Sequence, residues 1–396
     1  MSKTLPLIRL KPREGRRVRG GSPWAFSNEI EMSNAAKALE PGALVNLAME
    51  DGRVLGTGYF NVKSLIAVRL LSHEANAEIG KGFLAGRLAR ALALREALYA
   101  RPFYRLVHAE GDGLPGLTID RFGDTLVLQI TTAGMETLLE PLLAAIDAVL
   151  APQNVILRND TPVRALEGLE NDVRVAKGEI PSRITVEENG ARYFADLGGG
   201  QKTGWYYDQR DNRAFIASLA KDKSVLDAYC YTGGFGVLAA KAGAREMAAI
   251  DSSQNALTLA SEASSANGVE ARTKFIKADA FEELERLAKA NEKFDIVICD
   301  PPPFAKSRKD VEAASRAYRK LARAGASVTA KNGFLLLASC SYNMPLDRFT
   351  SECAIGIART GRSASLIRQA GASPDHPAHP HLPETAYLKS LVYALD

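Results

Sequence analysis

The most constraining feature of the sequence is the regular alternation of short apolar segments and helical segments after residue 224. The apolar segments are SVLDAYC, EMAAID, TKFIKAD, FDIVICD and GFLLLASC, and stretches such as FGVLAAKAG and AFEELERLAKAN between them have a helical pattern. Because parallel strands need crossover connections, this alternation predicts a doubly wound α/β domain with a parallel sheet. Ligands of such a sheet bind at the carboxyl ends of its strands.

The first half of the chain has a different pattern. Up to about residue 72, short strand-like segments alternate with turns such as EDGR and NVKS, which predicts a small β-barrel. A helix expected over 76–100 opens an α+β unit, which the segment ITVEENGARYFADL completes near residue 190. We therefore expect three domains, 1–75, 76–190 and 191–396, in a multidomain α/β protein.

Composition narrows the class of protein. Hydrophobic residues make up 46% and charged residues 24% of the 396 residues, which is typical of a folded globular chain. The sequence has no apolar run of the roughly 18 residues that span a bilayer, and its beginning lacks the apolar core of a secretory signal. We therefore expect a cytoplasmic protein without a membrane partner.

Positive charge is concentrated at the beginning of the chain. The net charge is +4, but seven basic residues and Glu14 give residues 1–22 a charge of +6, which leaves −2 for the rest. The basic residues are Lys3, Arg9, Lys11, Arg13, Arg16, Arg17 and Arg19. Residues 1–22, the basic arm, could contact phosphates, or they could be a solvated leading segment.

The first strand of the α/β domain leads into a glycine-rich turn, DAYCYTGGFG, which begins at Asp227. Glycines let a ligand approach the backbone and the amides of a helix N-terminus. The turn does not match the GxGxxG pattern of dinucleotide sites, and Asp227 would crowd a pyrophosphate but could pair with an amine. These residues favour a cationic ligand that carries an amino acid, such as S-adenosylmethionine.

Acidic residues end the next two strands. Asp251 could accept hydrogen bonds from a ribose diol, or it could cap the helix that begins in SSQNAL; Asp279 would lie near an adenine amino group. Together with the glycine-rich turn they give the predicted cofactor site: Asp227, Tyr231, Thr232, Gly233, Gly234, Phe235, Asp251, Ser252, Asp279, Ala280, Asp300 and Pro301.

The last two strand ends carry the predicted catalytic residues. Asp300 opens the stiff segment DPPPF, which could hold a flat base, and its carboxylate could orient that base, accept a proton or only stabilise the turn. Cys340, in the segment SCS, supplies a thiol at the ligand edge, and methylation of carbon 5 of a pyrimidine needs a nucleophile at carbon 6. Cys299 and Cys353 are better explained by inert burial, and Cys230 by packing in the cofactor loop.

A histidine cluster, HPAHPH, contains His376, His379 and His381. Its prolines predict an extended loop without a helical pair of ligands or nearby thiolates, which argues against zinc. We expect no metal site.

Taken together, the motifs along the chain resemble those of the bacterial 23S ribosomal RNA 5-methylcytosine methyltransferases that have an N-terminal PUA domain. The resemblance covers nearly the whole chain and rests on GSPWAFSNEI, RLVHAEGDGLPGLTIDRFGD, GGGQKTGWYYDQRDNR, DAYCYTGGFG, DPPPF, SCS and SPDHPAHPHLPETAYLK. It implies a PUA-like barrel, a central α+β domain and a Rossmann-like class I methyltransferase domain. It further implies S-adenosylmethionine as cofactor and 23S ribosomal RNA, or a large-subunit assembly intermediate, as partner; a homodimer is left open.

The resemblance also adds site residues and one departure. The family pattern places a DQR element against the cofactor, which adds Asp208, Gln209, Arg210 and Arg213, with Arg210 either neutralising the methionine carboxylate or joining the domains. The family usually has DPPKF, where this chain has Pro303, so Lys306 or Arg308 would have to replace that lysine at an RNA phosphate.

The predicted reaction begins with a cytosine that leaves its helix, since base atoms inside a duplex cannot be reached. Cys340 adds to carbon 6, carbon 5 is methylated, and a base removes the carbon 5 proton before the thiolate is eliminated. Three alternatives remain at this point: methylation of a nucleobase nitrogen without a cysteine nucleophile, a nicotinamide oxidoreductase, and a noncatalytic RNA-binding module.

Overall fold

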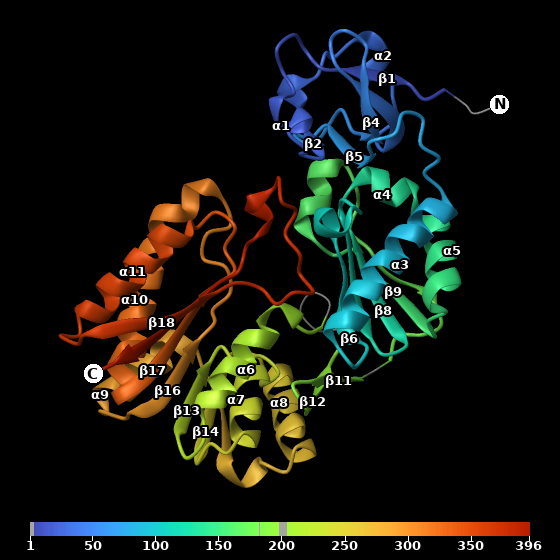
Figure 1. Ribbon diagram of the computed structural model, residues 1–396. Helices are drawn as coiled ribbons and strands as arrows, with labels where there is room; N and C mark the ends of the chain where they lie inside the picture. Colours follow the sequence, from blue (N-terminus) through green and yellow to red (C-terminus); the bar gives the residue numbers. More distant parts are fainter. Residues whose placement is uncertain (1–3, 182, 198–203) are drawn as a thin grey trace. The chain divides into compact units, whose positions relative to one another are not determined.

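The computed structural model describes residues 4–181, 183–197 and 204–396. These residues form two compact units, which are drawn in Figure 1. The first unit contains residues 4–181 and the later segment Asp375–Pro383. The second contains residues 183–197, 204–374 and Glu384–Asp396.

The first unit opens with a five-stranded sheet of order β1-β3-β4-β5-β2, in which only the β1–β3 pair is parallel. Its elements are β1 (Leu7–Arg9), α1 (Arg16–Arg19), β2 (Trp24–Ala25), α2 (Asn34–Lys37), β3 (Ala43–Ala48), β4 (Val54–Phe60) and β5 (Val68–Ser72). Apolar residues that include Ile8, Leu47 and Phe60 form a buried core of its own. The predicted small β domain is therefore present.

A second sheet of the first unit has the order β10-β9-β8-β7-β6. Its elements are α3 (Lys81–Leu98), β6 (Phe103–His108), β7 (Leu117–Phe122), β8 (Thr125–Ile130), α4 (Ala133–Thr137), α5 (Leu139–Leu150), β9 (Asn154–Arg158) and β10 (Val173–Lys177). Leu84 and Leu88 of α3 and Leu142 of α5 pack on this sheet in a separate core. These elements form the α+β fold that the sequence predicts.

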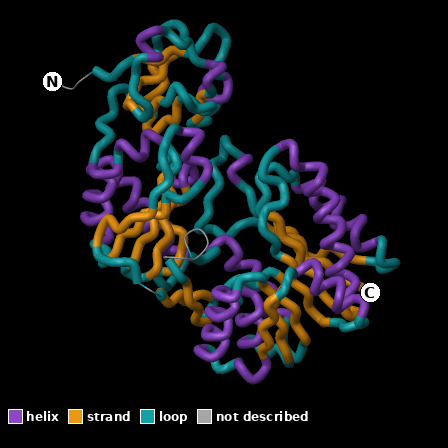
Figure 2. The backbone as a smooth tube through the Cα atoms, turned by 180° about the vertical axis from the view of Figure 1, so that it is seen from behind, coloured by secondary structure: helices purple, strands orange, loops and turns teal. Residues whose placement is uncertain are grey.

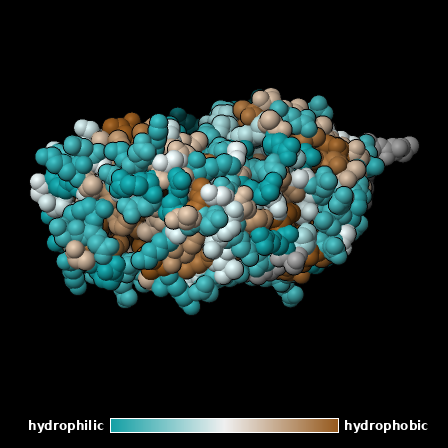
Figure 3. Space-filling view, turned by 90° about the horizontal axis from the view of Figure 1, so that it is seen from below, coloured by the Kyte–Doolittle hydropathy of each residue, from teal (hydrophilic) through white to brown (hydrophobic). Residues whose placement is uncertain are grey.

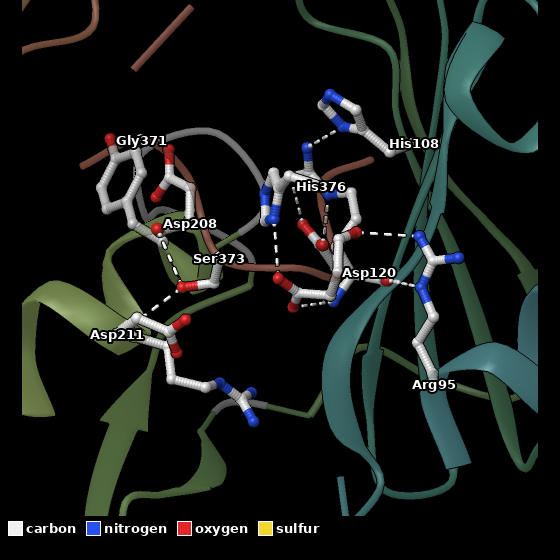
Figure 4. Close-up of polar contacts among 12 residues, drawn as sticks. Arg95, His108, Asp120, Asp208, Asp211, Gly371, Ser373 and His376 are labelled. Atoms are coloured by element: carbon white, nitrogen blue, oxygen red, sulfur yellow. Dashed lines mark hydrogen bonds and ion pairs between the residues drawn. The ribbon is translucent and has the colours of Figure 1, made fainter. Parts of the chain in front are cut away.

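The segment Asp375–Pro383 belongs to this first unit, although the sequence predicts that it is part of the last domain. The carbonyl of Asp375 accepts a hydrogen bond from the fully buried Arg95 at 2.8 Å, and its carboxylate accepts one from the backbone N–H of Arg105 at 3.0 Å. His376 Nδ1 lies 2.9 Å from the Asp375 carboxylate, and its ring centroid is 5.0 Å from that of His108 (Figure 4). Buried polar groups need hydrogen-bond partners, and those of this segment find them in the first unit, so the segment belongs to that unit and not to the last domain.

The second unit is built on a seven-stranded sheet of order β15-β14-β13-β16-β17-β19-β18. Its elements are β11 (Ile184–Glu188), β12 (Ala191–Ala195), the 3₁₀ turn η4 (Tyr207–Gln209), α6 (Arg210–Leu219), β13 (Ser224–Ala228), α7 (Gly234–Lys241), β14 (Glu246–Asp251), α8 (Gln254–Ala266), β15 (Thr273–Lys277), α9 (Ala280–Lys289), β16 (Phe294–Cys299), α10 (Val311–Val328), β17 (Thr329–Ser339), α11 (Leu346–Ala358), β18 (Ala364–Ala370) and β19 (Lys389–Leu395).

Helices cover both faces of this sheet, as Figures 1 and 2 show. Helix α7 packs with α6 and with α8, and α10 packs with α9 and with α11. Val297 and Leu335 of the sheet pack with Leu321 of α10 and Phe349 of α11 in a continuous core. The strands read as nearly unbroken apolar runs because both of their faces are buried.

The structure differs from the sequence-based expectation at two places in this unit. Strands β18 and β19 were not predicted, and β19 runs antiparallel to both β17 and β18. The β11–β12 hairpin lies in this unit rather than in the central one: the Tyr193 hydroxyl donates to the Gly234 carbonyl at 3.3 Å, and Asn267, which directly follows α8, exchanges hydrogen bonds with the backbone of Arg192. The boundary 75/76 stays a prediction, and the border between the two units lies before β11 rather than at 190/191.

Hydrophilic residues cover much of the face shown in Figure 3, and apolar residues appear there in scattered groups. Within the described residues, no helix combines the length and the apolar character that crossing a bilayer would require. Nor do the described residues contain a group of three or more His, Cys, Asp or Glu side chains that could hold a metal ion.

Candidate active site

The predicted site residues of the second unit gather at one edge of its sheet. Strands β13, β14, β15, β16 and β17 are parallel neighbours, so their carboxyl ends meet at that edge. Asp227, Asp251 and Asp300 stand at or directly after three of these ends, and Cys340 follows β17. Topology thus brings together residues that are more than one hundred positions apart.

Asp227 supports the turn that follows β13. Its Oδ2 accepts a hydrogen bond of 2.8 Å from the N–H of Gly236 in α7, and it is almost fully buried. Burial raises the pKa of this carboxyl to about 7, and the nearby charge of Asp300 adds to the shift. A carboxyl whose pKa is raised in this way would ionise readily beside a cationic ligand, because the positive charge favours the carboxylate.

The glycine-rich turn has an unusual backbone. Gly233 has a φ of 83°, and Tyr229 and Tyr231, which are not glycines, also have positive φ values of 65° and 49°. Such conformations cost free energy and persist where the surrounding structure fixes them, often at functional sites. Gly234 is required for a different reason, because a Cβ there would lie 2.5 Å from Nε of Arg213.

Arg210 and Arg213 face a carboxylate of this chain, that of Glu188 in β11. Arg213 lies 2.7 Å from Glu188 Oε1 and donates to the Tyr206 carbonyl at 2.9 Å, whereas Arg210 Nε lies 3.6 Å from Glu188 Oε2. The Trp205 indole N–H also donates to Glu188, at 3.0 Å. All four side chains are buried, so this cluster fixes the hairpin and the start of α6 beside the glycine-rich turn.

Asp208 and Gln209 reach the same edge of the sheet from η4. Gln209 Nε2 donates to Asp300 Oδ2 at 2.8 Å, and the Tyr387 hydroxyl donates to Asp208 Oδ2 at 2.5 Å. The Ser373 hydroxyl joins the Asp208 carbonyl to the N–H of Asp211, at 3.1 and 3.0 Å (Figure 4). The structure therefore places the DQR element against Asp300.

Asp251 and Asp279 have different local partners. Asp251 accepts hydrogen bonds from the N–H groups of Tyr231 at 2.9 Å and Ser253 at 2.8 Å. Helix α8 is capped by Ser253 and not by Asp251, so the alternative of a simple cap is wrong. Asp279 caps α9 by accepting from the N–H of Glu282 at 3.0 Å, which gives this exposed residue a structural role of its own. Ser252 is exposed and Ala280 is buried.

The segment DPPPF connects to the turn that carries Cys340. The N–H of Ala305 donates to the Ser341 hydroxyl at 3.2 Å, and the ring of Phe304 lies 4.8 Å from that of Tyr318. Pro301 is buried in this segment. Lys306 and Arg308, the expected substitutes for the family lysine, are both exposed.

Cys340 differs from the other three cysteines in its exposure. Cys230, Cys299 and Cys353 are buried, whereas Cys340 is partly accessible. Burial raises the pKa of the Cys299 and Cys353 thiols well above the ordinary value, which makes them poor nucleophiles. The contrast supports the sequence-based distinction between Cys340 and the buried thiols.

Sequence reasoning missed several residues of this site. Glu188 and Trp205 lie outside the predicted strand ends of the α/β domain: Glu188 belongs to the strand segment ITVEENGARYFADL, and Trp205 to the stretch GWYYDQR before α6. Lys389 and Tyr387 belong to the motif ETAYLK, but no role was predicted for them. These residues reach the site through β11 and β19, whose positions depend on tertiary contacts.

The residues present fit S-adenosylmethionine. Two buried polar atoms at this edge, Asp208 Oδ1 and Thr232 Oγ1, have no hydrogen-bond partner in the structure and could bind a polar ligand. Gly233 and Gly234 lead into the N-terminus of α7, and Asp227 supplies a carboxylate. Asp227 and Asp208 would hold the amino acid part of the cofactor, and Asp251 would hold its ribose.

The sheet order, the glycine-rich turn and the acidic strand ends define the class of S-adenosylmethionine-dependent methyltransferases. A family model with that description matches residues 170–394, and a model of a PUA-like domain matches residues 8–73. The crystal structure of SMU.776 complexed with SAH has the same fold, with a TM-score of 0.84 and 21% sequence identity over 98% of this chain and 100% of that chain.

Two relatives define the family more narrowly. The ribosomal RNA large subunit methyltransferase I of Pseudoalteromonas atlantica is 36% identical over 93% of this chain and 94% of its own length. The protein of the same name from Shewanella denitrificans is 37% identical over 97% of this chain and 98% of its own length. The chain belongs to this family of S-adenosylmethionine-dependent methyltransferases with an N-terminal PUA-like domain.

Proposed function

We propose that this chain methylates carbon 5 of a cytosine in 23S ribosomal RNA through a covalent adduct with Cys340. The relatives named above are large-subunit ribosomal RNA methyltransferases, which supports the class of substrate. The observation that carries the proposal is a partly accessible thiol directly after β17, in a turn that is hydrogen-bonded to Ala305, which directly follows the DPPPF segment. A methyltransferase that acts on a nitrogen atom needs no such thiol.

The proposed reaction begins when the Cys340 thiolate forms a bond to carbon 6 of the cytosine, and the electron pair of the carbon 5–carbon 6 double bond makes carbon 5 nucleophilic. S-adenosylmethionine, when bound, supplies the methyl group that carbon 5 receives. A base then removes the carbon 5 proton, the double bond reforms, and the carbon–sulfur bond breaks to release the thiolate. Asp300, held by Gln209, orients the ring nitrogen of the base.

The same proposal covers the partner and the location. Ribosomal RNA, or a large-subunit assembly intermediate, would bind through the PUA-like domain, and the exposed Lys306 and Arg308 would contact phosphates near the target base. We propose that the protein acts in the cytoplasm, where ribosomal subunits are assembled. Whether two copies associate is tested by measuring the molar mass in solution.

Substitution of Cys340 tests the proposed chemistry. We expect Cys340→Ala to lose at least about 10³-fold in methyl transfer, since the covalent route is removed, while it binds S-adenosylhomocysteine as the wild type does. Methyl transfer to ribosomal RNA is measured with labelled cofactor. Cys353→Ala, which removes a thiol buried in α11, is the matched control and should keep its transfer rate.

A second measurement identifies the adduct itself. RNA in which the target cytosine carries fluorine at carbon 5 cannot lose that substituent as a proton, so the wild type should remain covalently attached and Cys340→Ala should not. Full methyl transfer by Cys340→Ala would instead favour methylation of a nucleobase nitrogen. Bisulfite mapping of ribosomal RNA from cells without the protein should then show the loss of one large-subunit 5-methylcytosine.

A further inference from the structure

Lys389, the first residue of β19, is a buried lysine beside the end of β17, the strand that leads into Cys340. Strand β19 begins where β17 ends, and the two antiparallel strands pair Ser339 with Lys389. The Lys389 side chain therefore starts beside the turn Ser339–Ser341, and only 7% of the residue is exposed. Buried lysines are rare in proteins unless a partner compensates their charge.

The ammonium group of Lys389 contacts the turn of Cys340 directly. Lys389 Nζ donates a hydrogen bond of 2.6 Å to the carbonyl of Ser341, the residue that follows Cys340. Burial lowers the pKa of Lys389 to about 8, and the charge of a Cys340 thiolate raises it, so the two groups interact electrostatically. Near pH 7 the amine is mostly protonated.

Two tyrosines also lie within electrostatic range of Cys340. Tyr206 precedes η4 and Tyr318 belongs to α10, and both interact electrostatically with the thiol. Burial raises the pKa of both phenols, so they are neutral at pH 7 and contribute no charge. The Tyr318 hydroxyl instead shares hydrogen bonds with Ser341 at 3.0 Å and Ser339 at 2.7 Å, which fixes the turn on both sides of Cys340.

We propose that Lys389 is a positioning residue that holds Cys340 in its thiolate form and fixes the turn that carries it. This inference rests on the proposed function, in which the thiolate attacks carbon 6 of the cytosine. The thiol proton goes to bulk water, and Lys389 keeps its own proton. An ammonium group beside a thiol favours the thiolate, which is the nucleophilic form.

The test measures the thiolate directly and needs neither RNA nor cofactor. The rate at which iodoacetamide alkylates Cys340 is followed from pH 5 to 10 by mass spectrometry of the peptide that contains it, with the buried cysteines as internal references. We expect Lys389→Met to move the midpoint of this profile upward by about one pH unit or more, and to slow alkylation at pH 7 about tenfold. Lys389→Arg keeps the charge and should give a midpoint close to that of the wild type.

Two outcomes would overturn the inference. One is an unchanged midpoint in Lys389→Met when this variant still binds S-adenosylhomocysteine as the wild type does. The other, which needs no variant, is a midpoint for the native wild type that is no lower than that of the same chain unfolded in urea. Failure of the proposed function is distinguishable from both outcomes. Methyl transfer by Cys340→Ala would contradict the covalent mechanism, but it would not change the alkylation profile of Cys340 in the wild type or in the Lys389 variants.

Discussion

At the scale of single residues, the most consequential group is Asp227, a carboxyl that the fold buries completely. Its pKa rises from an ordinary value of 3.8 to about 7, because burial penalises the charged form. The folded protein therefore binds this proton more tightly than the unfolded chain does. The contribution of Asp227 to stability is present at low pH and is lost as the pH rises from about 4 through 7.

We therefore expect the ligand-free protein to lose about 2–3 kcal/mol of unfolding free energy through this group between pH 5 and 8, since one pKa unit corresponds to about 1.4 kcal/mol. Asp227→Asn has the same shape without the charge and should lose this part of the pH dependence. Urea unfolding of both proteins at several pH values measures the difference. If the free energy of unfolding changed with pH in the same way in both proteins, Asp227 would have an ordinary pKa in the folded state.

The sequence predicts some residues of the candidate site and not others. Asp227, Asp300 and Cys340 could be predicted, because each stands at or directly after the end of an apolar strand and the ends of parallel strands share one edge. The sequence allows two roles for Asp251, ribose binding and capping of α8, and the observed capping of α8 by Ser253 excludes the second. Lys389 gave no signal, since nothing in its local sequence tells that its strand pairs with β17.

At the scale of elements, the β11–β12 hairpin depends on one buried carboxylate. Glu188 compensates the buried Arg213 at 2.7 Å and accepts from Trp205 at 3.0 Å. Removing one partner of a buried ion pair leaves the other charge uncompensated, which is more damaging than losing a surface pair. Loss of the Glu188 carboxylate should therefore destabilise both the hairpin and the start of α6.

We expect Glu188→Ala to lower the free energy of unfolding by about 3–5 kcal/mol. Glu187→Ala is the matched control, because this neighbouring glutamate is less buried, and its effect should stay below about 1 kcal/mol. Thermal and urea unfolding measure both variants, and binding of S-adenosylhomocysteine reports whether the glycine-rich turn is retained. Equal effects of the two substitutions would contradict a special role for Glu188.

Elements of the sheet also differ in how far the sequence predicts them. Strands β13 to β17 alternate with helices, and this pattern is visible in the chain. Strands β18 and β19 have no helix between them, so the periodicity did not reveal their antiparallel pairing. The sequence predicts strand structure for the segment ITVEENGARYFADL as a whole, but the membership of the hairpin in the second unit depends on contacts with Gly234 of α7 and with Asn267, which directly follows α8.

At the scale of the whole molecule, the chain combines a PUA-like domain with a methyltransferase domain. The basic arm of the first domain is exposed at Arg9, Lys11, Arg13, Arg16, Arg17 and Arg19, whereas Lys3 lies outside the described residues. Lysine and arginine side chains that neutralise phosphates release counterions, so their contribution to RNA affinity depends on salt. The solvated-segment alternative predicts no such dependence.

We expect the triple substitution Arg13→Ala, Arg16→Ala and Arg19→Ala to weaken binding to ribosomal RNA and to reduce the slope of log affinity against log salt by about 2–3. Binding of S-adenosylhomocysteine should not change. The matched control replaces three exposed lysines of the second unit, Lys274, Lys289 and Lys293, by alanine. RNA titrations at several salt concentrations decide the question, and an unchanged slope in the arginine variant would make the arm a solvated segment.

The sequence by itself determined the class of the second unit, the edge of its sheet where ligands are expected, and the residues at the ends of strands β13 to β17. It could do so because strand–helix alternation and turn chemistry are local properties of the chain. Only the tertiary structure decided that Asp375–Pro383 belongs to the first unit, that Glu188 compensates Arg213, and that Lys389 lies beside Cys340. These contacts join residues far apart in the chain, and they are set by the need of buried charges for partners, which no local pattern encodes.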